Sequence, residues 1–136
     1  MMKSLKNIII FGAISLFVAS CGEKPSDVAK KFTEATLKFD FNEAKKYVAK
    51  AYYEDIDKLI EQIEAPESQD VLEIIKANAK DAKIEIIEEQ IAEDGNTATV
   101  KIKVSVMGEE DADNIPLIKE DGQWKVNKTI DLGNGK

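Results

Sequence analysis

The residues of this sequence that could move a proton are carboxylates and tyrosines, because the chain contains no histidine. General acid–base catalysis near neutral pH needs a group whose pKa lies close to the working pH. Asp40, Asp55, Asp57 or Glu89 could form a dyad with a tyrosine. No spacing singles out one pair, and helix caps or solvated charges account for the same acids. We therefore assign no catalytic residue from the sequence.

A run of acids offers the hard oxygen ligands that Ca²⁺ prefers: Glu109, Glu110, Asp111 and Asp113. The run lacks the glycine and the terminal glutamate of an EF-hand loop. A charged hairpin tip is usually just solvated, so we predict no metal and no cofactor there.

The aromatic residues have packing roles in our interpretation. Tyr47, Tyr52 and Tyr53 could line the mouth of a pocket, but amphipathic tyrosines on helices more often pack at the rim of a core with a wet hydroxyl. Trp124, in the segment "DGQWK", is expected to pack in the core beside the turn at Gly122.

Composition limits the classes of partner. The 136 residues suit one domain, and all 19 basic residues are lysines, against 26 acids, for a formal net charge of −7. Nucleic-acid binding depends on basic residues that neutralise phosphates, so we expect no nucleic-acid partner.

The lone cysteine, Cys21, lies where an apolar run ends. Two lysines, a short apolar stretch and small residues make residues 1–20 an export signal that is too short to span a bilayer. The sequence "VASC" resembles the lipobox of bacterial lipoproteins, which implies removal of residues 1–20, lipidation of Cys21 and a tether over residues 21–25. Two or three acyl chains would then anchor the domain in the cell envelope, and Gly22 favours the outer membrane over the inner one.

Apolar residues that recur at helical spacing predict four helices between residues 26 and 79. Ser26 is the expected N-cap of the first helix, and Asp40 with Glu43 has the spacing of a capping box that starts the second. The third is expected over about 54–64, before Pro66, and the fourth over about 68–79. Their expected buried residues are Val28, Phe32, Ala35 and Phe39; Ala44, Tyr47, Val48 and Ala51; Ile56, Leu59, Ile60 and Ile63; and Val71, Leu72, Ile75 and Ala79.

Alternating apolar residues then predict an antiparallel sheet. The clearest strand is "TATVKIKVSV", and a two-residue turn at Asp94-Gly95 joins it to a preceding strand with a bulge near Ile86. A second hairpin turns at Asp121-Gly122. The first hairpin places these residues opposite one another: Ile91 and Ala98, Glu89 and Val100, Glu88 and Lys101, Ile87 and Ile102, Glu85 and Lys103, Ile84 and Val104. Glu89 is the exceptional acid, expected at an open rim or in a pocket.

Three segments carry a resemblance to a known family: "KFDFNEAKKYV", "GNTATVKIKVSV" and "IPLIKEDGQWKV". Together they resemble small envelope lipoproteins of the NTF2-like superfamily, in particular the domain of unknown function DUF4878, from about Val28 to Ile130. The resemblance implies an α+β fold of the NTF2-like, or cystatin-like, type over residues 26–136. In this fold N-terminal helices pack on a curved antiparallel sheet of about four strands and form a cone. It implies no activity, because this scaffold serves both enzymes and binding proteins.

Three hypotheses for the function remain open. The favoured one is a lipid-anchored, non-catalytic binding or accessory module that holds a small ligand, a peptide or an envelope protein near the membrane. The second is a small envelope enzyme with a carboxylate base in the cone, and the third is a structural lipoprotein whose cone is filled and whose sheet forms a homodimer. An open apolar pocket without a buried acid would favour the first.

Overall fold

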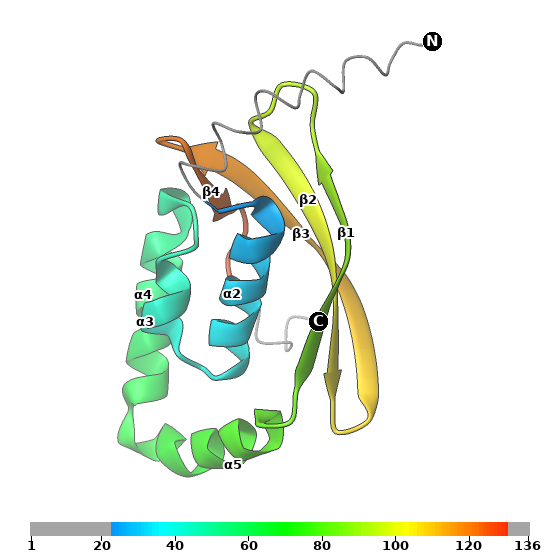
Figure 1. Ribbon diagram of the computed structural model, residues 1–136. Helices are drawn as coiled ribbons and strands as arrows, with labels where there is room; N and C mark the ends of the chain where they lie inside the picture. The colour runs from blue at the N-terminus through cyan, green and yellow to red at the C-terminus, as the bar shows by residue number, and fades with distance from the viewer. Residues whose placement is uncertain (1–22, 131–136) are drawn as a thin grey trace.

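The computed structural model describes residues 23–130 and shows an α+β fold (Figure 1). The predicted export signal and Cys21 lie outside the described residues. The helices are α2 (Pro25–Leu37), α3 (Phe41–Lys45), α4 (Tyr53–Glu64) and α5 (Gln69–Ala79), with short 3₁₀ turns at Lys50–Tyr52 and Pro66–Ser68. The strands are β1 (Lys83–Ile91), β2 (Thr97–Val106), β3 (Glu109–Glu120) and β4 (Gln123–Val126).

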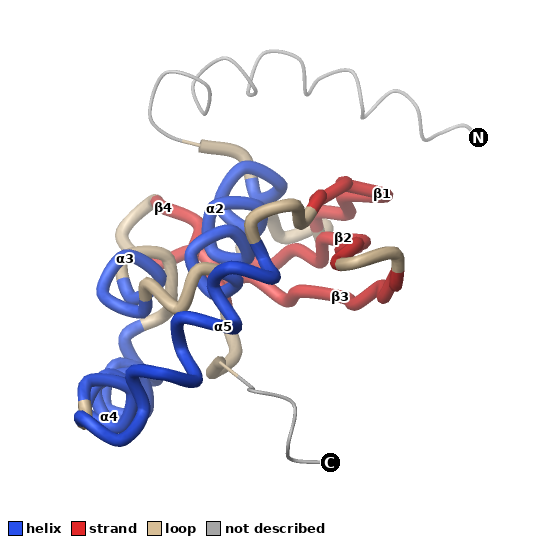
Figure 2. The backbone as a smooth tube through the Cα atoms, turned by 90° about the horizontal axis from the view of Figure 1, so that it is seen from below, coloured by secondary structure: helices blue, strands red, loops and turns tan. Residues whose placement is uncertain are grey.

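The four strands form one antiparallel sheet in the order β1-β2-β3-β4. Seen from below, the helices lie on one side of the curved sheet and the other side is uncovered (Figure 2). Helix α2 packs against the sheet, and α5 crosses the end of the domain between α4 and β1. Within residues 23–130, no helix is long and apolar enough to cross a membrane.

Helix α2 begins two residues earlier than predicted, because its N-cap is Lys24 and not Ser26. Lys24 is the N-cap residue and Pro25 occupies the first turn, where its missing N–H costs nothing. The backbone N–H of Ser26 instead donates a hydrogen bond to the Glu89 carboxylate, 2.9 Å away. A carboxylate from strand β1, 63 residues further along the chain, therefore caps this helix together with Asp27, which accepts from the Lys24 N–H at 3.4 Å.

The break between α2 and α3 was predicted correctly. Phe39 adopts a positive φ of 57°, which ends α2, and the N–H of Asp40 bonds to the carbonyl of Ala35. Asp40 caps α3 by accepting from the N–H of Glu43. Phe39 was expected in the buried face of the first helix, but it lies beyond the helix end, is only partly buried and stacks on Phe41.

Helix α3 is shorter than predicted, because the following residues pair with the sheet. Val48 forms a bridge with Val126, the N–H of Ala49 bonds to the Val126 carbonyl, and the Val126 N–H bonds to the carbonyl of Tyr47. A backbone that pairs with a strand cannot continue as a helix, so the predicted helical stretch through Ala51 is wrong after Lys45.

Helices α4 and α5 fall close to their predicted bounds. Ile56 of α4 is fully buried, and Leu72 of α5 is 7% exposed. Val71 was predicted to be buried but is 56% exposed, and Ile74 is 62% exposed. Helix α5 lies at the end of the domain, and only one side of it meets the rest of the fold (Figure 1).

The pairing of β1 with β2 contains the predicted irregularity, one residue later than expected. The register shifts between Ile86 and Glu88, so Ile86, not Ile87, lies opposite Ile102. Ile87 is the extra residue and is 45% exposed. The other five predicted pairs are observed.

The hairpin turns explain where each strand ends. Met107-Gly108 and Asp121-Gly122 are two-residue turns in which both residues have positive φ, as the type I′ turns of tight hairpins require. The turn at Asp94-Gly95 is longer than predicted, with four residues between the last paired residues Ala92 and Thr97. The acidic run, predicted as a hairpin tip, is the start of strand β3, paired with the end of β2.

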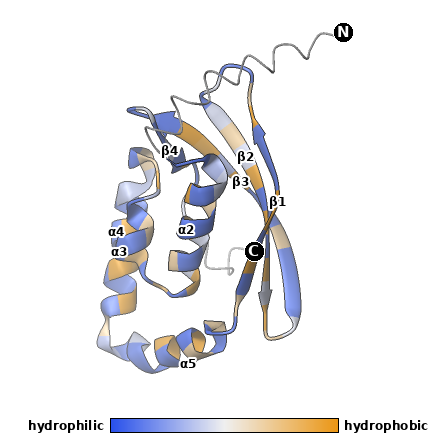
Figure 3. Ribbon diagram, in the orientation of Figure 1, coloured by the Kyte–Doolittle hydropathy of each residue, from blue (hydrophilic) through white to orange (hydrophobic). Residues whose placement is uncertain are grey.

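The core lies between α2, α3, α4 and the concave face of the sheet. Strand β2 shows the predicted alternation, with Ala98, Val100 and Ile102 buried and Thr97, Thr99 and Lys101 exposed. Trp124 is 6% exposed and packs in this core, as predicted. Hydrophobic and hydrophilic residues alternate along the strands and helices, and α5 also carries hydrophobic residues (Figure 3).

Candidate functional site

The four acids considered for catalysis are separated in the fold. Asp40 caps α3, Asp57 forms an ion pair of 2.7 Å with Lys45, and Glu89 accepts from Ser26. Asp55 is exposed in the first turn of α4. Each of the first three acids thus already has a structural role, and the structure does not gather them into a site.

The tyrosines have the rim positions predicted for them. All three are partly buried, and the Tyr52 hydroxyl donates to the carbonyl of Asn127 at 3.4 Å. The Lys45 ammonium lies over the Tyr53 ring, 5.1 Å from its centre. The Tyr47 hydroxyl donates to Glu43 at 3.0 Å, a partner that sequence reasoning did not identify.

The contact between Tyr47 and Glu43 changes the pKa of both groups. A hydrogen bond from Lys46, followed by the one from Tyr47, lowers the pKa of the Glu43 carboxyl. The hydrogen bond to Glu43, followed by burial, raises the pKa of the Tyr47 hydroxyl. Both shifts move the groups away from neutrality, so this pair is not poised for proton transfer at neutral pH.

An open groove of about 1000 Å³ lies between α2, the C-terminal end of β2, the N-terminal end of β3 and the segment after β4. We call it the concave groove. Its floor is apolar and consists of Phe32, Leu37, Ile102, Val104, Val106, Ile115 and Ile130. Among residues 23–130, no charged or polar residue is buried, so the described floor of this groove carries no buried acid.

Acids form one wall of the concave groove. Asp113 lies opposite Ile102, Asp111 opposite Val104 and Glu109 opposite Val106. Since directly opposed residues in a sheet share a face, these acids lie on the concave side, about 7 Å apart along the strand. Lys128 forms an ion pair with Asp113 at 3.2 Å. Glu110 also lines the groove, although it lies opposite Ser105 and forms an ion pair with Lys103 at 3.6 Å. Four acids and one lysine leave this groove with a net charge of −3.

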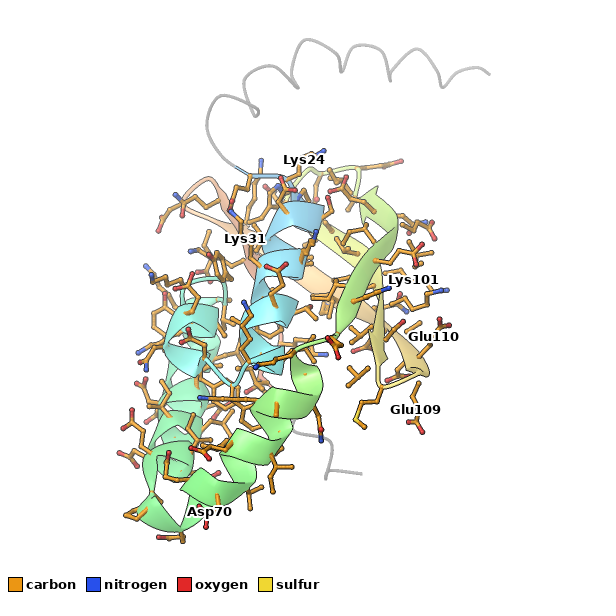
Figure 4. All side chains as sticks on the ribbon, turned by 60° about the horizontal axis from the view of Figure 1, so that its bottom comes forward. Lys24, Lys31, Asp70, Lys101, Glu109 and Glu110 are labelled. Atoms are coloured by element: carbon orange, nitrogen blue, oxygen red, sulfur yellow. The ribbon has the colours of Figure 1, made fainter. Side chains whose placement is uncertain are left out.

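The sequence contains a signal for this acidic wall that the prediction of a hairpin tip overlooked. Glu109, Asp111 and Asp113 precede Ile115 at steps of two residues, so they lie on the same face of β3 as the buried Ile115 and Leu117. The groove is lined by the C-terminal half of α2, and Figure 4 shows Glu109 and Glu110 well separated from Lys24 at the N-terminal end of that helix. No cluster of three or more metal-binding side chains is present in the part of the chain that the structure describes.

A second open groove, of about 1110 Å³, lies between α2, α5 and the start of β1. We call it the lysine groove because five lysines line it: Lys30, Lys38, Lys76, Lys80 and Lys83. Leu37 is the one residue that lines both grooves. Sequence reasoning did not identify this site, because its lysines come from three separate elements.

The fold defines the class of this protein as an NTF2-like α+β domain. An NTF2-like transpeptidase from Campylobacter jejuni has a similar structure, with a TM-score of 0.55 and 20% sequence identity, over 80% of this chain and 100% of that one. A de novo designed NTF2 fold protein, NT-9, matches with a TM-score of 0.41 and 13% identity over 82% of this chain and 89% of that one. No curated protein sequence matches this chain.

The model of the domain of unknown function DUF4878 matches residues 19–127. The chain therefore belongs to the DUF4878 family, in agreement with the resemblance noted in its sequence.

Proposed function

We propose that this protein is a lipid-anchored, non-catalytic binding module of the bacterial cell envelope that holds its ligand in the concave groove. The observation that carries the proposal is an open groove with an apolar floor and no buried acid among residues 23–130. An acid becomes a general base near neutral pH mainly when burial raises its pKa, and this groove offers no such group in its described lining.

The lining also indicates the chemistry of the ligand. The apolar floor suits an aliphatic or aromatic group, and a rim with a net charge of −3 suits a positive charge beside it. The ligand we infer for this groove is a small molecule or peptide with an apolar part and an amine.

The proposed anchor gives the groove a useful orientation. A lipidated Cys21 would be only four residues from Pro25, where α2 begins. The concave groove lies at the other end of α2, which is about 20 Å long. The groove would then be presented away from the membrane that holds the anchor.

The name of the Campylobacter protein does not transfer a reaction to this chain. A likeness at 20% identity supports the fold alone. A transpeptidase also needs an activated nucleophile, and without histidine or a cysteine after Cys21 this chain offers neither a Cys–His nor a Ser–His pair.

Binding to the concave groove can be tested with dodecyltrimethylammonium, used below its critical micelle concentration and followed by calorimetric titration. Val106 lines the groove and Ser105 is the preceding residue of β2, on the other face of the sheet. We expect wild type and Ser105→Lys to bind the probe, and Val106→Lys to lose binding. Equal binding by both variants, or no binding by wild type, would contradict the proposal.

The anchor can be tested separately. We expect the mass of membrane-extracted wild type to exceed that of residues 21–136 by a diacylglyceryl group, with or without a third acyl chain. Cys21→Ser should move the protein to the soluble fraction or leave the precursor uncleaved. Soluble, unmodified wild-type protein would contradict the lipid anchor while leaving the binding test unaffected.

A further inference from the structure

The lysine groove differs in charge from the rest of the domain. Residues 23–130 contain 16 lysines and 25 acids, a net charge of −9. The lining of this groove contains five of those lysines and only three acids, Glu34, Asp40 and Glu64, a net charge of +2. The concave groove, with its net charge of −3, has the opposite sign.

The lysines of this groove also differ from the others in their partners. None of the five forms an ion pair with a described residue, although acids outnumber lysines in the chain. Six of the other eleven described lysines form ion pairs: Lys31, Lys45, Lys46, Lys50, Lys103 and Lys128. Like charges around one groove repel, and a bound anion would relieve that repulsion.

The acids in the lining neutralise this charge only in part. Asp40 is engaged at the N-terminus of α3. Glu34 of α2 lies four residues after Lys30 and four before Lys38, the C-cap residue of that helix, so it can offset one of them. Lys76, Lys80 and Lys83, which extend from α5 into β1, have only Glu64 as a further acid in the lining.

The floor of the lysine groove is apolar. Leu72 is buried there, and Leu37, Phe39, Ile63 and Ile84 are partly buried. Lysines can keep their ammonium groups in water while their aliphatic stems cover apolar surface. An apolar floor with cationic groups at its edge is complementary to an aliphatic chain that ends in an anionic group.

We propose that the lysine groove binds a single-chain anionic amphiphile, with the acyl chain on the floor and the carboxylate or phosphate headgroup among Lys76, Lys80 and Lys83. A fatty acid and a lysophospholipid share this chemistry. The site shares only Leu37 with the concave groove, so the proposal for one groove can be disproved without affecting the proposal for the other.

The first experiment titrates the exported domain with dodecanoate below its critical micelle concentration. The double variant Lys76→Gln/Lys80→Gln removes two charges from the groove, and Lys58→Gln/Lys101→Gln is the matched control. All four lysines are exposed, and the control pair lies outside both grooves. We call Lys76→Gln/Lys80→Gln the groove variant. We expect it to bind dodecanoate on the order of tenfold more weakly than wild type, because two exposed charge contacts are lost, and we expect the control to bind like wild type.

A series of ligands separates the two parts of the site. Lengthening the chain from octanoate to dodecanoate should raise the affinity by up to roughly fourfold per methylene group if the floor holds the chain. Dodecanol, which lacks the charge, should bind more weakly than dodecanoate to wild type but equally to wild type and the groove variant. Dodecyltrimethylammonium binding to the concave groove should not change in the groove variant.

The same variants show whether the site binds fatty acids alone or also lysophospholipids, and they show which results would overturn the proposal. Binding of lysophosphatidylglycerol in monomeric form, lost in the groove variant, would extend the ligand class to phospholipid headgroups. The proposal is overturned if wild type does not bind dodecanoate, if control and groove variants weaken binding equally, or if octanoate binds as tightly as dodecanoate. Binding to phosphatidylglycerol vesicles that is unaffected by the groove variant, without binding to dodecanoate, would replace it with a general membrane-surface contact.

Discussion

Removing the carboxylate of Glu89 should destabilise the domain by freeing the N-terminus of α2. This helix has no side-chain cap from its own N-cap residue, Lys24. Glu89 of β1 replaces that cap, because its carboxylate accepts from the Ser26 N–H at 2.9 Å. The contact also joins the first helix to the edge strand of the sheet.

The magnitude follows from two separable contributions. A negative charge at a helix N-terminus contributes about 0.3–1 kcal/mol, and loss of a capping acceptor costs about 0.5–2 kcal/mol. Since Glu89 is exposed, the lower half of each range applies. We expect a loss of about 0.5 kcal/mol for Glu89→Gln, which keeps an acceptor, and about 1 kcal/mol for Glu89→Ala, which removes it.

Thermal and urea unfolding of a fragment of residues 21–136 measure this loss. For a domain of this size, 1 kcal/mol corresponds to about 4 °C in Tm, so the expected shifts are about 2 °C and about 4 °C. Glu88→Gln and Glu88→Ala are the matched controls, because Glu88 is the neighbouring acid of β1, opposite Lys101, and faces away from the concave side. These controls should cost less than half as much, and salt should reduce the effect of Glu89→Gln.

Equal losses for the Glu88 and Glu89 variants would refute this reasoning. A Glu89→Gln variant that keeps the wild-type Tm but abolishes turnover of a small metabolite would refute it more strongly, because Glu89 would then act as a base.

Three further predictions test the core, a turn and the pH response. Ile56→Ala should lose about 2–5 kcal/mol of unfolding free energy, whereas Ile74→Ala on the exposed side of α5 should change it little; urea unfolding compares them. Gly122→Ala should lose about 1 kcal/mol because φ is 80° there, measured the same way. The lowered pKa of Glu43 means that its ionised carboxylate stabilises the fold above the unfolded-state pKa of about 4.3. This stabilisation is lost as the pH falls through the pKa of Glu43 in the folded state. The wild-type Tm should therefore fall more steeply than that of Glu43→Gln between about pH 5 and 3.

Local patterns in the sequence were sufficient for most of the fold. Alternation of apolar residues defined β2, and five of the six predicted cross-strand pairs followed from matching apolar faces and opposite charges. Asp40 could be identified as a cap, and Asp121-Gly122 as a tight turn, because both depend on the residues next to them. Such features have a short range, so a single stretch of sequence contains the whole cause.

Errors arose where distant segments meet. The pairing of Val48 with Val126 ended α3 early, and the acids of β3 became a strand because β2 pairs with them. Likewise Ser26 does not cap α2 as predicted, because its own N–H donates to the Glu89 carboxylate of β1. In each case a hydrogen bond or packing contact formed with a remote segment outweighed a local preference, which is worth only a fraction of a kcal/mol to about 1 kcal/mol.

The sequence by itself determined the acidic composition, the absence of histidine and the single cysteine, and with them the chemistries that this chain does not offer. It also determined the α+β class, because helical and alternating patterns occupy separate halves of the chain. Only the tertiary structure decided which charges gather: five lysines from α2, α5 and β1 surround one groove, and the acids of β3 line another. The reason is geometric, since the charge of a groove depends on which elements form its walls, and that is set by packing and not by neighbours along the chain.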